Sequence, residues 1–142
     1  MSTNATGQPV RIVMIEDDEG HARLIERNIR RAGVNNEIVH FTSGTSALDC
    51  LLDAGTTPAA LLILLDLNLP DMTGVDILAR VKGDPHLKVA PVIVLTTTDD
   101  QREIQRCYEL GANVYIVKPV NYDSFATAIR QLGLFFSVMQ VP

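Results

Sequence analysis

Cysteine is scarce in this sequence, and tryptophan is absent from it. The two cysteines, Cys50 and Cys107, both lie in segments whose apolar residues recur at helical spacing. In a reducing compartment, two such residues are better explained as buried thiols than as a disulfide. We therefore expect both cysteines to be buried, free and without a chemical role.

Long apolar runs and an excess of positive charge are also lacking. No apolar stretch approaches the roughly 20 residues that span a membrane, and residues 1–9 lack the basic and apolar regions of a signal peptide. The 12 basic and 17 acidic residues give a net charge of −5, which disfavours binding to nucleic acid. We expect a cytoplasmic protein that binds neither membrane nor nucleic acid.

What is present is the pattern of an α/β domain. The chain has 142 residues, 46% of them hydrophobic, enough for one domain that buries about 70% of the surface of its unfolded form. Short apolar runs alternate with segments of helical periodicity, which indicates βα units wound on a parallel sheet. The five expected strands are Val10 to Ile15, Glu37 to Phe41, Ala60 to Leu65, Pro91 to Thr96 and Val114 to Val117.

Five helices are expected, one after each strand; apolar stripes mark four of them, and end signals mark the fourth helix. The first helix ends at Gly33, whose missing side chain suits a left-handed cap, and the fourth begins at Asp100 and ends at Gly111. The domain is expected to span residues 10–132, after a flexible N-terminus at residues 1–9. The stripes comprise Ala22, Ile25, Ile29 and Ala32; Ala47, Leu48, Leu51 and Leu52; Val75, Leu78 and Val81; and, in the fifth helix, Phe125, Ile129, Leu132 and Phe136.

Polar residues follow four of the strands. Glu16 and Asp17 come after the first strand, and Asp66 stands at the exposed tip of the third. Thr96 ends the fourth strand, and Lys118 follows the fifth. Parallel strands bring their carboxyl ends to one edge of a sheet, so these side chains should converge. Clustered carboxylates repel one another unless a cation lies among them, which favours Mg²⁺, and a neighbouring lysine suits a phosphoryl oxygen.

These residues carry a resemblance to a known family. The acidic pair, an Asp-x-Asn-x-Pro-x-x-x-Gly motif that begins at Asp66, the threonine and a Lys-Pro pair are independent matches in the right order. From Val10 to about Leu132, the chain resembles the receiver domain of two-component response regulators, in the CheY-like superfamily. The resemblance implies a doubly wound, flavodoxin-like sheet of five parallel strands in the order 2-1-3-4-5, flanked by five helices.

The resemblance also implies a role for each polar residue. Asp66 would accept a phosphoryl group from a sensor histidine kinase or a histidine phosphotransfer protein. Mg²⁺ would be held by Glu16, Asp17, Asp66 and the backbone carbonyl of Asn68. The domain would assist its own phosphorylation and dephosphorylation without being an enzyme in the usual sense.

Further positions of the family pattern concern the switch. Thr96 and Lys118 would contact the phosphoryl oxygens. Thr96 and Tyr115 would change position on phosphorylation. The bond between Lys118 and Pro119 is expected to be cis, which proline permits at modest cost.

Simpler interpretations stay open beside this one. An aspartate after an apolar strand is often only a cap, and Asp18 is expected to be a helix cap or a solvated residue. His21, His40 and His86 have no spacing that suggests a metal site. The same fold also binds FMN or nucleotides, although the acidic run after the first strand would repel their phosphates. A third alternative is a pseudo-receiver that is never phosphorylated.

A narrower resemblance concerns the partner. The segment Arg23-Leu24-Ile25-Glu26, the loop Asp84-Pro85-His86 and the apolar C-terminus look like single-domain receivers that partner phytochrome-type histidine kinases. Arg27, Arg30 and Arg31 form a basic helix face, which is either solvated or a partner contact.

The last ten residues, 133–142, are expected to be an apolar extension of the fifth helix. If that helix continues past Gly133, Leu134, Phe135 and Val138 turn away from the stripe that docks on the sheet. We expect Leu134, Phe135, Val138 and Met139 to form a homodimerisation arm, because exposed apolar surface usually marks an interface. A frayed tail, or one that folds back on its own domain, is the alternative.

Overall fold

The computed structural model describes residues 10–53, 61–97, 100–118, 123–124 and 126–127. Their elements follow one another as alternating strands and helices, as predicted from the sequence. In chain order these are β1 (Arg11–Ile15), α1 (Glu19–Arg31), β2 (Ile38–Phe41), α2 (Gly44–Leu51), β3 (Leu61–Asp66), α3 (Gly74–Gly83), β4 (Val92–Thr96), α4 (Gln101–Glu109) and β5 (Val114–Val117).

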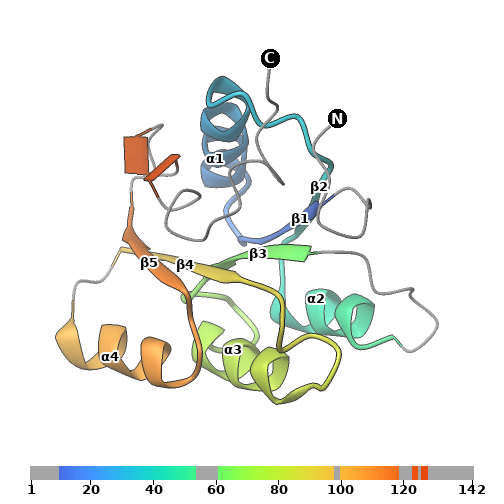
Figure 1. Cartoon of the computed structure of the whole chain (residues 1–142), viewed down its shortest axis with the longest axis vertical. Coiled ribbons are helices and arrows are strands. Elements are labelled where there is room, and N and C mark those ends of the chain that lie inside the picture. Colours follow the sequence, from blue (N-terminus) through green and yellow to red (C-terminus); the bar gives the residue numbers. More distant parts are fainter. Residues whose placement is uncertain (1–9, 54–60, 98–99, 119–122, 125, 128–142) are drawn as a thin grey trace.

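The five strands form one parallel sheet in the order β2-β1-β3-β4-β5 (Figure 1). This order confirms the topology implied by the family resemblance. The register places Asp66 opposite Leu95 and Thr96 opposite Val117. The last residues of the three neighbouring strands β3, β4 and β5 therefore lie side by side.

The helices lie in two layers. In Figure 1, α1 covers one face of the sheet, and α2, α3 and α4 cover the other. Successive residues of a strand face opposite layers, so each central strand contributes to both. On the α1 face the core includes Ile12, Met14, Leu62, Leu64, Ala22, Ile25 and Ile29. On the other face it includes Val13, Ile15, Ile63, Leu65, Ala47, Leu48, Ile77 and Leu78.

The expectation of five helices is not borne out, because the described residues contain four. Beyond β5, residues 123–124 and 126–127 are helical, and Ala126 is buried. The rest of the predicted fifth helix lies outside the described residues, as do residues 1–9, Ala60 and Pro119. The undescribed stripe and arm residues are Phe125, Ile129, Leu132, Leu134, Phe135, Phe136, Val138 and Met139.

Polar caps and glycines set the helix ends, largely as the sequence predicts. Asp18 is the N-cap of α1 and accepts a hydrogen bond from His21 N at 2.9 Å, and Asp100 caps α4 through Arg102 N. Gly33 and Gly111 end α1 and α4 with φ values of 88° and 110°, which a residue with a side chain rarely adopts.

One prediction about the cysteines is wrong. Cys107 is buried, but Cys50 is exposed, and both are free. Cys50 lies off the stripe that α2 buries, because it comes two residues after Leu48 and residues at that spacing do not share a helix face. Arg30, by contrast, is more than a solvated charge, since its Nη1 donates to Val34 O at 3.1 Å and to Asn36 O at 2.7 Å.

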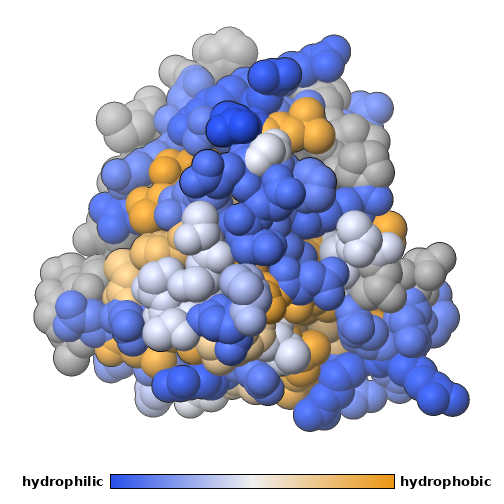
Figure 2. Space-filling view, turned by 180° about the vertical axis from the view of Figure 1, so that it is seen from behind, coloured by the Kyte–Doolittle hydropathy of each residue, from blue (hydrophilic) through white to orange (hydrophobic). Residues whose placement is uncertain are grey.

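The hydropathy of the described residues can be followed on the face seen from behind. There, hydrophobic atoms appear in separate areas among polar ones (Figure 2). Within the part of the chain that the structure describes, no helix has the length and apolar character needed to cross a bilayer.

Candidate functional site

The predicted polar residues converge at the carboxyl edge of the sheet. Glu16 follows β1, Asp66 ends β3, Thr96 ends β4 and Lys118 follows β5. Glu16, Asp66 and Thr96 are at most 3% exposed. Among the described residues, these three are the ones whose polar or charged side chains are buried, and all three lie at this edge of the sheet. This confirms that topology assembles them from distant parts of the sequence.

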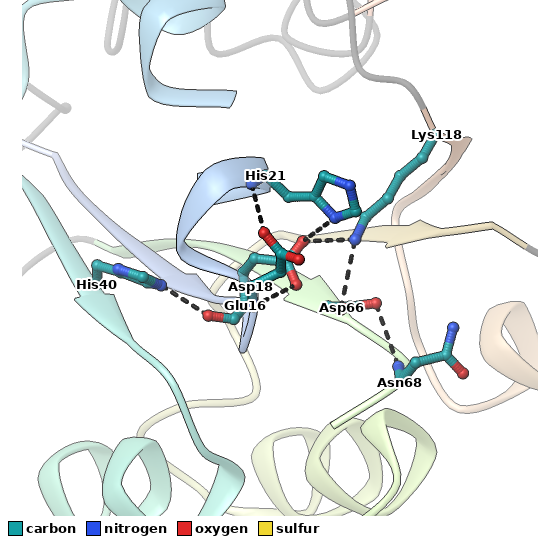
Figure 3. A network of polar contacts seen from close by, with 7 residues as sticks. All are labelled: Glu16, Asp18, His21, His40, Asp66, Asn68 and Lys118. Carbon is teal, nitrogen blue, oxygen red and sulfur yellow. Dashed lines mark hydrogen bonds and ion pairs between the residues drawn. The ribbon is translucent and has the colours of Figure 1, made fainter. Parts of the chain in front are cut away.

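Lys118 joins the two buried carboxylates. Its Nζ forms an ion pair with Glu16 Oε1 and lies 3.4 Å from Asp66 Oδ2 (Figure 3). The lysine side chain is only 11% exposed. Buried charges are costly unless they are paired, and here one ammonium group faces two carboxylates. With both carboxylates ionised, these three groups carry a net negative charge, which favours the binding of a further cation.

Asp66 is buried rather than exposed, contrary to the sequence-based expectation. The reason is that Lys118 and the chain that leaves β3 cover the end of the strand. Asn68 N donates a hydrogen bond to Asp66 Oδ1 at 3.1 Å, while Oδ2 faces the lysine. Both oxygens of the carboxylate thus have a positively polarised neighbour.

Glu16 is held through its backbone as well as its side chain. His40 Nε2 lies 2.7 Å from Glu16 O, and Asp18 N donates to Glu16 Oε2 at 3.4 Å. His21 Nδ1 lies 3.9 Å from Glu16 Oε1 at the edge of the site (Figure 3). The sequence shows no sign of these histidine contacts, because β2 and α1 bring the rings to Glu16 only in the folded chain.

Burial raises the pKa of Glu16 from 4.5 to about 7. The neighbouring Asp66 carboxyl adds to this increase, and the Lys118 ammonium opposes it. Removing a carboxylate from water disfavours its charged form, so a fraction of Glu16 carries a proton near neutral pH. The net charge at this edge of the sheet therefore changes with pH around neutrality.

The acidic residues fit a hard divalent cation. One carboxylate oxygen from each of Glu16, Asp17 and Asp66 can lie within 4.8 Å of the other two. Two of these residues are buried and Asp17 is exposed, which leaves one side of the cluster open to water. Mg²⁺ prefers such a set of a few carboxylates with remaining water or phosphate ligands. The backbone carbonyl of Asn68 stays a predicted ligand.

The two predicted switch residues are in contact. Thr96 is fully buried, and its side chain forms a hydrogen bond with the phenol of Tyr115, which is partly buried on the α4 face. Burial, followed by the negative charge of Glu103, raises the pKa of Tyr115 to about 12. The phenol therefore keeps its proton. Lys118 N also donates to Thr96 O at 2.7 Å, so the ends of β4 and β5 are tied together.

The glycine of the Asp66 motif is required by close packing. A Cβ on Gly74 would lie 2.5 Å from Leu67 Cα and 2.7 Å from Asp66 O. Gly74 N also donates to Leu67 O at 3.0 Å. The start of α3 thus presses directly against the backbone of the aspartate, which explains the spacing from Asp66 to Gly74.

Sequence reasoning also missed the role of Asp71, near the site. Asp71 lies within the motif, but its carboxylate bonds to the start of α2, more than 25 residues earlier. No local sequence pattern announces such a contact.

A parallel sheet of this order, with an acidic cluster and a lysine at its carboxyl edge, is the arrangement of a receiver domain. A family model for the response regulator receiver domain matches residues 12–130. The chain therefore belongs to the response regulator receiver family and to two-component signalling. This membership favours the receiver over an FMN or nucleotide site.

Relatives with solved structures agree with this family assignment. A response regulator receiver domain from Rhodospirillum rubrum is 72% identical, with a TM-score of 0.76, and the match covers 93% of this chain and 96% of that one. The bacteriophytochrome response regulator AtBRR is 34% identical, with a TM-score of 0.80 and coverage of 94% and 99%.

A third relative is response regulator Rcp1 of Synechocystis sp. It is 31% identical over 137 residues, which are 94% of this chain and 93% of that protein. Its Mn²⁺-bound crystal structure superposes with a TM-score of 0.75 at 29% identity, covering 94% of this chain and 99% of that one. A divalent cation in that structure agrees with the acidic cluster described above.

The affinity of the cluster for Mg²⁺ should depend on pH. A cation must displace the proton that Glu16 carries below its pKa of about 7. The apparent affinity should therefore rise by roughly tenfold between about pH 6 and about pH 8, and then level off. NMR titrations with Mg²⁺ at both pH values measure this change.

The control is Glu16→Gln, in which the pH dependence of the Mg²⁺ affinity should disappear.

The stability of the metal-free protein should depend on pH as well, because the folded protein binds a proton on Glu16 that the unfolded chain releases. Its free energy of unfolding should therefore fall as pH rises from 4.5 to about 7. A wild-type Mg²⁺ affinity that is equal at both pH values would contradict the assignment.

Proposed function

We propose that this protein is a response regulator that accepts a phosphoryl group on Asp66 from a phosphohistidine. The donor is a sensor histidine kinase or a histidine phosphotransfer protein. The observation that carries this proposal is the Asp66 carboxylate itself, buried at the end of β3 within 3.4 Å of Lys118 Nζ and beside Glu16 and Asp17. A carboxylate that served only as a cap would need none of these neighbours.

The transfer requires little covalent help from the protein. An Asp66 oxygen attacks phosphorus, the bond from phosphorus to the imidazole nitrogen of the donor breaks, and the donor histidine takes back the electron pair. The product is an acyl phosphate on Asp66. Phosphoryl transfer depends mainly on positioning and on neutralising charge, which the buried carboxylate and its lysine provide.

The residues around Asp66 have separate roles in this proposal. Lys118 Nζ already lies near Asp66 Oδ2, and after phosphorylation it would form an ion pair with a phosphoryl oxygen. Glu16, Asp17, Asp66 and the Asn68 carbonyl would hold Mg²⁺. When bound, that ion neutralises charge on the carboxylates and the phosphoryl group.

Phosphorylation would be read out through Thr96 and Tyr115. A phosphoryl oxygen offers the Thr96 hydroxyl a stronger, charged acceptor than the phenol that it contacts now. When Thr96 turns toward that oxygen, Tyr115 loses a hydrogen-bond partner and repacks against the α4 face. The result is a two-state switch that is biased by charge.

The test is the uptake of phosphate by the wild-type protein. Incubation with acetyl phosphate and Mg²⁺ should add the mass of one phosphoryl group, stable in acid and labile in base, in the intact-mass spectrum. Removal of Mg²⁺ with a chelator should suppress the label, because the carboxylates then repel the incoming anion. Absence of any label with Mg²⁺ present would favour the pseudo-receiver, a folded module that is never phosphorylated.

We also propose a phytochrome-type histidine kinase as the partner, in the cytoplasm. The relatives named bacteriophytochrome response regulators support this proposal. So do the sequence segments that prompted the same expectation, of which α1 carries Arg23 and the exposed Leu24.

A homodimer through residues 133–142 is proposed on the sequence pattern alone. The apolar stripe of the predicted fifth helix is enough to dock it on the sheet. This leaves four further apolar residues without a partner in that docking: Leu134, Phe135, Val138 and Met139. Light scattering at micromolar concentration should show a dimer for the full chain and a monomer for a chain that ends at Gly133. A full-length monomer, or a dimer that survives the truncation, would refute this proposal.

A further inference from the structure

Asp71 supplies hydrogen-bond acceptors to a helix in another part of the chain. Its Oδ1 accepts from Gly44 N at 2.9 Å, and its Oδ2 accepts from Thr45 N at 2.8 Å and from the Thr45 hydroxyl. The N-cap of α2 itself, Ser43, accepts from one backbone N–H of the helix, Ser46 N at 3.2 Å, and its hydroxyl also bonds to the Ser46 hydroxyl at 2.7 Å. The first N–H groups of a helix lack partners within it, and here two of them are bonded by Asp71.

Apolar packing reinforces this contact at the neighbouring residue. A Cβ on Gly44 would lie 2.5 Å from Met72 Cγ and 2.8 Å from Ile77 Cδ1. The backbone of the first turn of α2 therefore meets the side chain of Met72 directly. Asp71 and Met72 together dock the segment between β3 and α3 on α2.

The same segment contacts the phosphoacceptor at its other end. Asn68 and Thr73 form an isolated antiparallel bridge that closes the loop at its base. Asn68 N donates to Asp66 Oδ1 at 3.1 Å. A movement of the loop tip at Asp71 would therefore be expected to shift the bridge, and with it the position of Asn68 relative to Asp66.

We propose that Asp71 is a positioning residue for the Asp66 site: by fixing the loop tip to the first turn of α2, it holds Asn68 against Asp66 in the geometry that binds Mg²⁺. This inference rests on the proposed function of Asp66. The Thr45 hydroxyl and the two backbone N–H groups lower the pKa of Asp71 to about 2, so the acceptor is ionised throughout the physiological pH range.

The experiment compares two ways of weakening the start of α2. Asp71→Ala removes the contact between the loop and the helix, and Ser43→Ala removes the helix's own cap without touching the loop. Both variants should lose stability, but only Asp71→Ala should bind Mg²⁺ more weakly. We expect its half-saturating Mg²⁺ concentration to rise roughly tenfold, as is typical when a residue that orients a metal ligand is removed.

A second pair of variants keeps the test decisive if Asp71→Ala does not fold. Thr45→Val removes one donor from the helix side of the contact and should weaken Mg²⁺ binding several-fold, whereas Thr45→Ser keeps that donor and should behave as wild type. Mg²⁺ binding is followed by NMR shifts at Asn68. Amide exchange in the metal-free protein gives an independent readout, because Gly44 N and Thr45 N should lose protection in Asp71→Ala.

The outcomes separate this inference from the proposed function. Weaker Mg²⁺ binding in Asp71→Ala and Thr45→Val, with Ser43→Ala unchanged, supports the positioning role. Wild-type Mg²⁺ affinity in folded Asp71→Ala, or an equal loss in Ser43→Ala, overturns it. Failure of the wild-type protein to take up phosphate from acetyl phosphate refutes the proposed function instead, and the Mg²⁺ titrations still decide the role of Asp71.

Discussion

Replacing Asp66 with Asn is expected to abolish the Mg²⁺-dependent phosphoryl label. The amide has nearly the shape of the carboxylate, so its oxygen can still accept the hydrogen bond from Asn68 N. It lacks the negative charge that makes the carboxylate a nucleophile and a metal ligand. Intact-mass spectra after incubation with acetyl phosphate should show one added phosphoryl group in the wild-type protein and none in the variant.

A matched substitution controls for the loss of one acidic residue in this region. Asp76 is exposed in the first turn of α3, and Asp76→Asn should label as the wild-type protein does. The Asp66 variant should also lower the pKa of Glu16, because the neighbouring carboxyl that raises it is gone. Equal labelling of Asp66→Asn and wild type would show that the phosphoacceptor is another residue.

The second large effect is expected from Gly74→Ala. The added methyl group would lie 2.5 Å from Leu67 Cα and 2.7 Å from Asp66 O, so the backbone on one side must move. Overpacking against the backbone should lower the free energy of unfolding by roughly 2 to 4 kcal/mol. Urea unfolding followed by circular dichroism measures this loss as a lower midpoint.

The other glycine of α3 provides the control. A Cβ on Gly83 has no neighbouring atom within 4 Å, and its φ is not positive. Gly83→Ala should therefore leave stability unchanged or raise it by less than about 1 kcal/mol. If Gly74→Ala unfolded at the same urea concentration as Gly83→Ala, the close approach between α3 and Asp66 would be wrong.

Strands were the most predictable part of this fold. A strand buried on both faces must be apolar throughout, so runs such as Leu61 to Leu65 stand out from the amphipathic helices around them. The boundaries differ by about one residue. Asp66, for example, continues β3 because it still pairs with Leu95, which the polarity of its side chain does not reveal.

The polar residues of the site were predictable for a topological reason. Parallel strands bring their carboxyl ends together, so the order of polar residues along the sequence already implies that Glu16, Asp66 and Lys118 meet. The solvent exposure of these side chains was not predictable from the sequence. Asp66 is buried because Lys118, more than 50 residues later, covers it, and that contact exists only in the folded chain.

Contacts between a side chain and a distant backbone escaped prediction altogether. His40 approaches the carbonyl of Glu16, Lys82 Nζ donates to Ala90 O at 2.7 Å, and Asp71 caps α2. Backbone groups are present in every residue, so a sequence does not reveal which of them a side chain will reach. The exposure of Cys50 was mispredicted because burial was inferred from the residue type and a reducing compartment, although Cys50 lies outside the apolar stripe of α2.

The two hydrophobic layers have no residue in common, and the sheet separates them. Tyr115 packs against the layer beneath α2, α3 and α4, whereas α1 packs on the opposite one. A rearrangement around Tyr115, as proposed for the switch, would therefore act first on the layer beneath α2, α3 and α4. If Thr96 and Tyr115 switch as proposed, a protein that binds beside α4 would meet a changed surface after phosphorylation, whereas the described surface of α1 lies on the opposite layer.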